Sequence, residues 1–267
     1  MNMQWRYGVY GLMLVGALVT GGSGCGDDDS LSPDAVPGTA VSFQLDADFT
    51  QAEAYYNFPY PSDLRLRSDG TVEFSGYPLR SSNAVLPPLK AVAARLRGFP
   101  VVTAAYFRWS DAVAPQHIDD IIPADPQSPI LLIDIDPTSP DRGQLFPVVA
   151  STLSPEDYTP ELLLAVAAVS GHVLHPQRQY AFVVQRALGD ANGEPLGVPQ
   201  AMAQLRAGHT PDGTRGAQAQ ALYAPLWDTL GQLGIARSAV AAATVFTTNN
   251  DVVDLFTMSE ALLDQYD

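Results

Sequence analysis

The sequence has a single cysteine, Cys25, and only 14 lysines and arginines against 29 acidic residues. One cysteine excludes both a disulfide framework and a cysteine-based metal site within one chain. The formal net charge of -15 disfavours contact with nucleic-acid phosphates and anionic lipid headgroups, and no lysine and arginine cluster offsets it. We therefore expect no nucleic-acid partner, and we interpret the acidity mainly as a means of solubility.

The sequence also lacks the motifs of several enzyme classes. After the N-terminal leader there is no Gly-x-Ser-x-Gly segment, which an α/β-hydrolase needs to expose its serine nucleophile. A glycine-rich phosphate loop and a dinucleotide fingerprint are absent too, so nothing supports a nucleotide cofactor. We therefore assign no catalytic residue and expect no hydrolytic activity from this chain alone.

Residues 1–24 have the composition of a signal peptide. Arg6 supplies a positive charge, about 14 mostly apolar residues follow, and residues 21–24 are small. This apolar run is shorter than the roughly 20 residues of a membrane-spanning helix. Gly24 and Cys25 resemble the lipoprotein cleavage box, although Gly22 stands where a larger aliphatic residue is usual. We expect Cys25 to be the acylated first residue of a mature lipoprotein; an ordinary signal peptide and an uncleaved anchor are the alternatives.

Acylation would place the protein at the cell envelope, most simply on the outer membrane, facing the periplasm or the exterior. Several acyl chains, palmitate among them, would form a membrane anchor that a single chain cannot provide. Residues 25–39 are acidic and contain proline and glycine, so we expect a flexible tether. Residues 40–250 form one β-rich domain, or two subdomains with a break near 100–130. Residues 251–267 are expected to be a C-terminal helix or the start of a further domain.

Short apolar stretches separated by proline, glycine and aspartate predict a mainly β fold. Residues 189–193 have the composition of a turn that joins two strands. The predicted strands are Ala40–Leu45, Thr71–Phe74, Val101–Trp109, Ile130–Ile135, Tyr180–Ala187 and Ala243–Thr248.

Three segments have helical periodicity: Leu86–Leu96, Leu222–Leu233 and Val252–Gln265. The first contains Pro87 and Pro88, which a first helical turn tolerates, whereas Pro225 should start or kink the second. In all three the apolar stripe is interpreted as facing the core. Trp109 and Trp227 are likewise expected in the core rather than at a cofactor.

Two groups of residues have types that can bind metal ions. Asp190, Asn192 and Glu194 alternate in a loop, a spacing that can offer oxygen ligands to calcium, but the full twelve-residue calcium loop is missing. Turn formation explains the three residues equally well. His172 and His175 lack an identifiable third zinc ligand. We therefore expect no cofactor, with calcium as the alternative.

Two further groups of side chains are candidates for a surface role. Asp134 and Asp136, followed by Asp141, are interpreted as solvated charges at a strand end. Tyr55, Tyr56, Phe58 and Tyr60 crowd six residues, a composition that can stack on a sugar or receive a peptide. Packing of these tyrosines onto a sheet is the favoured interpretation, and a glycan or surface protein is the partner if they bind a ligand.

Two resemblances accompany these patterns. A strand at residues 180–184, the Asp-x-x-Gly-x-Pro-Leu sequence at 190–196 and Phe246-Thr247-Thr248 resemble bacterial Ig-like domains of surface proteins. Phe58–Leu64, with its Pro-x-Pro-x-Asp-Leu sequence, and the Asp-Gly turn at 69–70 resemble the N-terminal region of bacterial virulence-factor lipases. In that family a helix precedes the Phe-Thr-Thr strand, and the catalytic α/β-hydrolase domain lies further toward the C-terminus.

The resemblances imply an Ig-like β-sandwich with helical insertions. The predicted function is a lipid-anchored, non-catalytic binding, spacer or accessory module. One alternative is the N-terminal portion of a surface lipase or esterase whose hydrolase domain is absent from this sequence. Another is an adhesion module stiffened by calcium.

Overall fold

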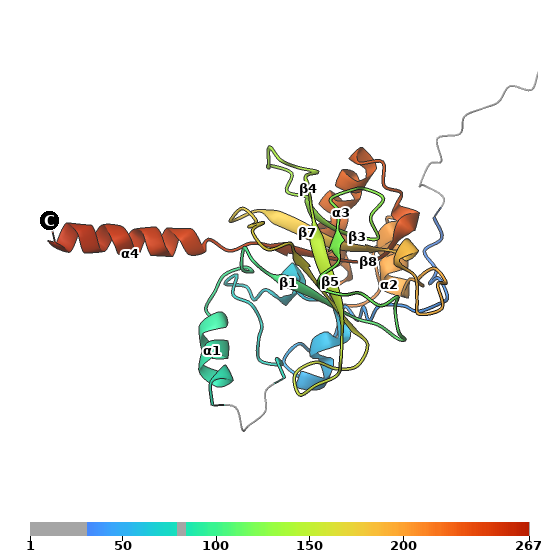
Figure 1. Cartoon of the computed structure of the whole chain (residues 1–267), viewed down its shortest axis with the longest axis horizontal. Helices are drawn as coiled ribbons and strands as arrows, with labels where there is room; N and C mark the ends of the chain where they lie inside the picture. Colours follow the sequence, from blue (N-terminus) through green and yellow to red (C-terminus); the bar gives the residue numbers. More distant parts are fainter. Residues whose placement is uncertain (1–30, 79–83, 267) are drawn as a thin grey trace, which may run out of the picture.

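The computed structural model describes residues 31–78 and 84–266, so the predicted signal peptide and Cys25 lie outside the described residues. Within this part of the chain the strands form two four-stranded antiparallel sheets (Figure 1). One has the strand order β1-β6-β5-β2 and the other β4-β3-β7-β8. A single hydrophobic cluster includes residues of both sheets. The expectation of a sheet-rich fold is therefore confirmed at the level of two antiparallel sheets.

The strands lie between Ala104 and Thr247, and helices precede, interrupt and follow them. The strands are β1 (Ala104–Arg108), β2 (Ile121–Ile122), β3 (Ile130–Asp134), β4 (Leu145–Phe146), β5 (Val148–Leu153), β6 (Leu163–Ala168), β7 (Gln179–Gln185) and β8 (Val240–Thr247). The α-helices are α1 (Leu86–Ala93), α2 (Gln200–Arg206), α3 (Gly216–Gln232) and α4 (Asp251–Tyr266). The 3-10 helices are η2 (Ala52–Asn57), η3 (Asp63–Arg65), η4 (Arg186–Leu188) and η5 (Arg237–Ala239).

The sheet that contains β3, β7 and β8 is covered on both faces. All five residues of β3 are buried, and β7 and β8 have one partly exposed residue each. Successive residues of a strand point to opposite faces, so continuous burial requires a layer on each side. Helices α2 and α3 pack on β8, and β5 of the other sheet contacts β3. The apolar runs of β3, β7 and β8 thus mark the central layer of the fold.

The second sheet has one face toward the core. Buried and partly exposed residues alternate strictly along β1, and Phe107 and Ala105 are its buried members. The same alternation begins in β5. Because one face of this sheet is partly open, side chains such as Tyr106 on β1 reach the surface.

Helix α3 is the core-facing helix predicted around Leu222–Leu233. Its Tyr223 ring is completely buried, and the Tyr223 hydroxyl donates to the Ala243 carbonyl of β8 at 2.9 Å. The helix begins at Gly216 and continues through Pro225, so the proline is not at its start. Trp227 on the same helix and Trp109 after β1 are both buried, as expected.

Several strand predictions need correction. Val101–Trp109, Ile130–Ile135, Tyr180–Ala187 and Ala243–Thr248 overlap β1, β3, β7 and β8. Ala40–Leu45 and Thr71–Phe74 make only isolated bridges, from Val41 to Trp109, from Val72 to Leu66 and from Thr71 to Arg97. The turn at 189–193 joins η4 to the segment before α2 rather than two strands. Strands β2, β4, β5 and β6 and helix α2 were not predicted.

Two of the three helical stripes do not face the core, contrary to expectation. No residue of α1 is buried, and Leu89 and Val92 are 57% and 59% exposed. Helix α4 projects from the body (Figure 1), and Leu255 and Leu263 are 68% and 62% exposed. No helix among the described residues is long and apolar enough to span a membrane.

The second half of the predicted tether lies on the domain. Val36 forms an antiparallel bridge with Val198, and the Ala35 amide donates to the Gln200 side chain at 2.9 Å. The Gln200 amide in turn donates to the Pro33 carbonyl at 3.0 Å. From Pro33 on, the chain is therefore held against the start of α2.

Candidate functional site

Tyrosines from four separate segments meet beside the outer edge of β1. Tyr55 and Tyr56 lie on η2, Tyr106 on β1, Tyr77 precedes α1, and Tyr158 follows β5. The rings of Tyr55 and Tyr56 meet edge to face with centroids 5.1 Å apart. Tyr55 also meets Tyr77 edge to face at 5.5 Å, and Tyr56 meets Tyr106 at 6.2 Å. Such pairs stabilise each other by about 0.5–1.5 kcal/mol beyond the area they bury.

The buried guanidinium of Arg65 lies beneath these rings. Arg65 is 1% exposed, and its Nη2 donates to the carbonyl oxygens of Tyr55 at 2.6 Å and Phe58 at 2.8 Å. Its Cζ lies 4.2 Å from the centroid of Phe49 and 4.7 Å from that of Tyr55. Its Nε and Nη1 have no hydrogen-bond partner among the described residues, so ring faces supply much of the electrostatic compensation.

Outside this packed layer the tyrosines line an open groove. Two adjoining cavities of about 470 Å³ and 380 Å³ share Tyr56, Glu156, Tyr158 and Thr159. A tight turn presents the last three of these residues, because the amides and carbonyls of Glu156 and Thr159 bond reciprocally at 3.0 and 3.3 Å. The Tyr56 hydroxyl donates to the Tyr158 carbonyl at 3.2 Å and fixes the turn to η2. The tyrosine groove is therefore a preformed concavity.

Among the described residues that line the tyrosine groove, acidic side chains outnumber basic ones. Glu53, Glu156 and Asp157 line its wall and are exposed, and Arg108 is the cation of this described set. The Arg108 guanidinium donates to the Asn57 side chain at 3.2 Å. Exposed carboxylates beside half-exposed aromatic rings offer hydrogen-bond acceptors and flat apolar surface together.

The hydroxyls of Tyr55, Tyr56 and Tyr60 stay neutral near pH 7. Burial raises the pKa of Tyr55, Tyr56 and Tyr60 well above the ordinary value, and the nearby charge of Arg65 only partly opposes this. A neutral phenol donates and accepts hydrogen bonds but is a poor base. Of these three, Tyr56 lines the groove, and its hydroxyl is suited to hydrogen bonding rather than to proton transfer.

The three tyrosines predicted from sequence differ in position. Tyr55 is 2% exposed, and the partly buried Tyr60 pairs with Tyr106 at the edge of β1 and packs against the core, so both form the layer beneath the groove. Tyr56 is 8% exposed and lines the groove with its outer edge. Tyr77, Tyr106 and Tyr158 are the more accessible rings, and sequence reasoning missed them because they are isolated residues far apart in the chain.

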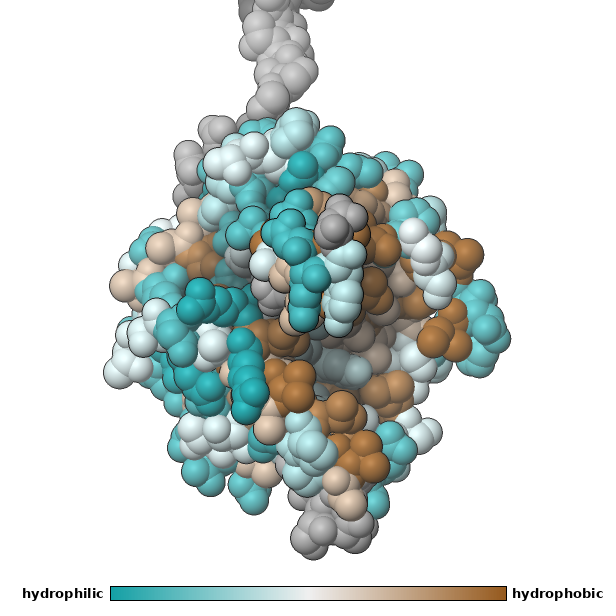
Figure 2. Space-filling model, turned by 90° about the vertical axis from the view of Figure 1, so that its left-hand side faces the viewer, coloured by the Kyte–Doolittle hydropathy of each residue, from teal (hydrophilic) through white to brown (hydrophobic). Residues whose placement is uncertain are grey.

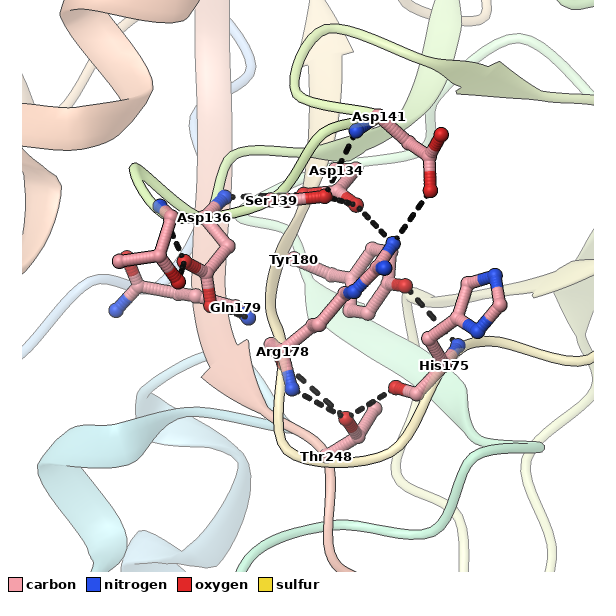
Figure 3. Close-up of polar contacts among 10 residues, drawn as sticks. Asp134, Asp136, Ser139, Asp141, His175, Arg178, Gln179, Tyr180 and Thr248 are labelled. Atoms are coloured by element: carbon pink, nitrogen blue, oxygen red, sulfur yellow. Dashed lines mark hydrogen bonds and ion pairs between the residues drawn. The ribbon is translucent and has the colours of Figure 1, made fainter.

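The acidic residues predicted at the end of β3 form a closed network with Arg178, shown in Figure 3. Arg178 Nη1 lies 3.3 Å from an Asp134 carboxylate oxygen and 2.7 Å from one of Asp141. Asp134 also accepts from the Ser139 hydroxyl at 2.8 Å and the Asp136 amide at 3.0 Å. Because its side chain is only 1% exposed, the interpretation of Asp134 as a solvated charge was wrong.

Register explains why these charges meet. Asp134 pairs with Tyr180 at the end of β3 and the start of β7, which brings Arg178 to the same edge of the sheet. Asp136 accepts from Thr138 at 2.7 Å and from the Gln179 amide at 3.2 Å. These carboxylates are thus engaged by donors of the protein itself, and the network holds the ends of the strands together.

The calcium candidates form a turn. Asp190 Oδ1 accepts from the amides of Asn192 at 2.8 Å and Glu194 at 3.0 Å, the geometry of an aspartate-stabilised turn. His172 and His175 are exposed in the loop before β7. Within residues 31–78 and 84–266, no three histidine, aspartate, glutamate or cysteine side chains are grouped so as to hold a metal ion.

No protein-family model, curated protein or solved structure matches this chain.

Proposed function

We propose that this protein is a non-catalytic binding module of the bacterial cell envelope and that the tyrosine groove is its binding site. The observation that carries the proposal is the gathering of Tyr56, Tyr77, Tyr106 and Tyr158 around one preformed concavity. Phenol hydroxyls and exposed carboxylates give the groove hydrogen-bonding capacity. The buried Arg65 packs on Tyr55 and Tyr60, whose rings contact those of the groove. This support restrains the groove rings and lowers the entropy lost on binding.

The proposed ligand is a glycan that is neutral or positively charged. Tyrosine rings pack against the apolar faces of sugar rings, and the carboxylates of Glu53 and Glu156 accept hydrogen bonds from sugar hydroxyls. The same carboxylates, in a protein of net charge -15, repel anionic polysaccharides. Cavities of 380 and 470 Å³ are in the range of small-ligand sites and suit a few sugar units.

We further propose that the two sheets are an Ig-like β-sandwich with helical insertions, related to the N-terminal region of virulence-factor lipases. The motifs that suggested this relation are in contact. Asp63 of the Pro-x-Pro-x-Asp-Leu segment accepts from the Thr247 amide at 2.8 Å and the Thr247 hydroxyl at 2.6 Å, and Thr247 belongs to the Phe-Thr-Thr strand. The Pro61 carbonyl accepts from the Thr244 hydroxyl of the same strand. Contact between the two motifs supports a shared fold.

Acylation of Cys25 and attachment to the outer membrane are also proposals, supported by the apolar leader before Cys25. The expected result is that native protein extracted from membranes begins at Cys25 with the added mass of its acyl chains. Intact mass measurement with mapping of the N-terminal peptide tests this. An unmodified N-terminal peptide, or one that retains residues 1–24, would show a different mode of export.

A second candidate function is the accessory region of a surface lipase or esterase. The observation that favours it is the exposed apolar face of α4, which a following domain would cover. The same mass measurement distinguishes the binding module from the lipase accessory region. A native product that continues past Asp267 would support the lipase accessory region.

Substitution of Tyr106 or Tyr158 by alanine is expected to weaken glycan binding about tenfold, because each loses one ring contact. Titration calorimetry of the full chain in detergent, with oligomers of N-acetylglucosamine as the neutral probe, measures this. The deacetylated, cationic oligomer should also bind, whereas heparin, an anionic polysaccharide, should not.

The matched control is Ile121→Ala. Ile121 is 63% exposed on β2, at the opposite edge of the sheet from β1. Its loss should leave the affinity unchanged. Equal affinity of wild-type protein and both tyrosine variants would rule out the groove as the site, and binding of heparin alone would rule out the proposed charge preference.

A further inference from the structure

Two helices of the described chain expose an apolar stripe. On α4 the stripe consists of Leu255, Phe256, Leu262, Leu263 and Tyr266, which are between 57% and 80% exposed. Their spacing places them on one face of the helix. Just before and within α1, Val85, Leu89 and Val92 follow the same helical spacing and are 57–65% exposed. Both helices lie on the same side of the molecule (Figure 1), and Figure 2, which faces that side, shows several apolar patches among polar ones.

The two sequence segments that carry the stripes differ in charge. Between Tyr77 and Ser110 the sequence has five arginines or lysines and no acidic residue, in a protein with a net charge of -15. From Ser238 to Asp267 it has five acidic residues and no lysine or arginine. An α4 stripe that packs on α1 therefore brings an acidic helix to a segment whose charged residues are all basic. The acidic helix is also a poor match for a membrane with anionic lipids.

The start of α4 is fixed to the body. Thr248 and Asn249 are 2% and 4% exposed, and the Asn249 amide donates to the Phe99 carbonyl at 2.7 Å. Val253, in the first turn, still lines a cavity with Arg95 and Leu96. Helix α4 has 16 residues and is therefore about 24 Å long. Beyond its first turn it runs away from the body (Figure 1). The exposed residues in the second half of the helix, Leu262, Leu263 and Tyr266, are thus carried beyond the body.

We propose that the α4 stripe of one copy packs on the α1 stripe of a second copy, and the reverse, in a two-fold symmetric dimer. Reciprocal exchange of this kind uses the same two surfaces on both subunits. At roughly 100 Å² for each large apolar side chain, the eight residues of the two stripes bring about 800 Å² per partner, the size of a standard stable interface. Glu260 flanks the α4 stripe, and the exposed Arg95 follows α1. Attraction between Glu260 of one copy and Arg95 of the other would set the orientation of α4 on α1.

The test is cross-linking between two differently tagged full-length copies in one bacterial host. One copy carries Val92→Cys and the other Leu262→Cys, and a short bismaleimide joins cysteines that lie close together. We expect a mixed dimer containing both tags only when both substitutions are present. Either single substitution with a wild-type partner is the control for reaction with Cys25.

Charge reversal separates specific packing from chance contact. Arg95→Glu in the Val92→Cys copy should reduce the mixed dimer several-fold, and Glu260→Lys in the other copy should restore it. Both residues are exposed, so neither change should prevent folding. Absence of the mixed dimer would overturn the proposal. The stripes would then be surfaces for another domain. A cross-link found only within one chain, when both cysteines are placed in it, would also overturn it in favour of α4 folding back.

Discussion

Replacing Arg65 with alanine is expected to lower the free energy of unfolding by about 3–5 kcal/mol. The guanidinium is 1% exposed, fills space between Phe49 and Tyr55, and is the hydrogen-bond donor for two buried carbonyls. Alanine would leave a cavity and two carbonyl oxygens without this donor. The variant no longer has to bury a charge, which offsets part of the loss in unfolding free energy. The lost packing contacts of the side chain are not offset. Denaturant unfolding of both proteins measures the difference.

Arg67→Ala is the matched control, two residues away. Arg67 is 38% exposed in its side chain and pairs with Glu73 at 2.8 Å, so its loss should cost at most about 1 kcal/mol. Arg65→Met keeps most of the side-chain volume without the charge. Its loss of unfolding free energy should lie between those of Arg65→Ala and Arg67→Ala. An Arg65→Ala variant as stable as Arg67→Ala would refute the role of Arg65 as the support of the tyrosine layer.

Replacing Asp134 with alanine is expected to cost about 2–4 kcal/mol of unfolding free energy. The carboxylate is 1% exposed and is the acceptor for Arg178, Ser139 and the Asp136 amide. Its removal leaves buried donors without this acceptor, although Arg178 keeps Asp141. Thermal and denaturant unfolding at neutral pH measure the effect.

Asp141→Ala is the control, because Asp141 lies closer to Arg178 than Asp134 does. The distance is 2.7 Å against 3.3 Å, but the Asp141 side chain is 41% exposed and is screened by water. Its loss should therefore cost no more than about 1 kcal/mol. If Asp141→Ala proved the more damaging change, proximity rather than burial would determine the strength of the network.

Strand prediction succeeded where burial is continuous. The apolar runs of β3, β7 and β8 are covered on both faces, and their hydrophobicity identifies them without knowledge of their partners. Strand β6 reads Leu-Leu-Ala-Val-Ala-Ala, which is equally suited to a helix. Its extended conformation follows from pairing with β1 and β5, and such long-range pairing is invisible in a local pattern.

The helical stripes show a different limit of the sequence. Periodicity correctly predicts the helices α1, α3 and α4, and it indicates that one face of each requires a partner. Periodicity does not show whether the partner surface is the core of the same chain or another surface. Only α3 covers its stripe within the core; α1 and α4 leave theirs exposed.

The candidate site was predicted only in part. The aromatic run at residues 55–60 correctly indicated an aromatic cluster, but its members are mostly the floor of the groove. Tyr77, Tyr106 and Tyr158 are brought together by β1 and by the turn after β5, so they carry no local signal. Arg65 was missed because an arginine is ordinarily expected at the surface.

The most direct test of the proposed binding site is an NMR titration of protein labelled in its tyrosine rings. N-acetylglucosamine oligomers should shift the resonances of Tyr77, Tyr106 and Tyr158, which line the groove, and leave those of Tyr180 and Tyr223 in the core unchanged. Assignment by single Tyr→Phe substitutions identifies each resonance. If no groove tyrosine responds to the neutral or the cationic oligomer, the tyrosine groove is not a glycan site.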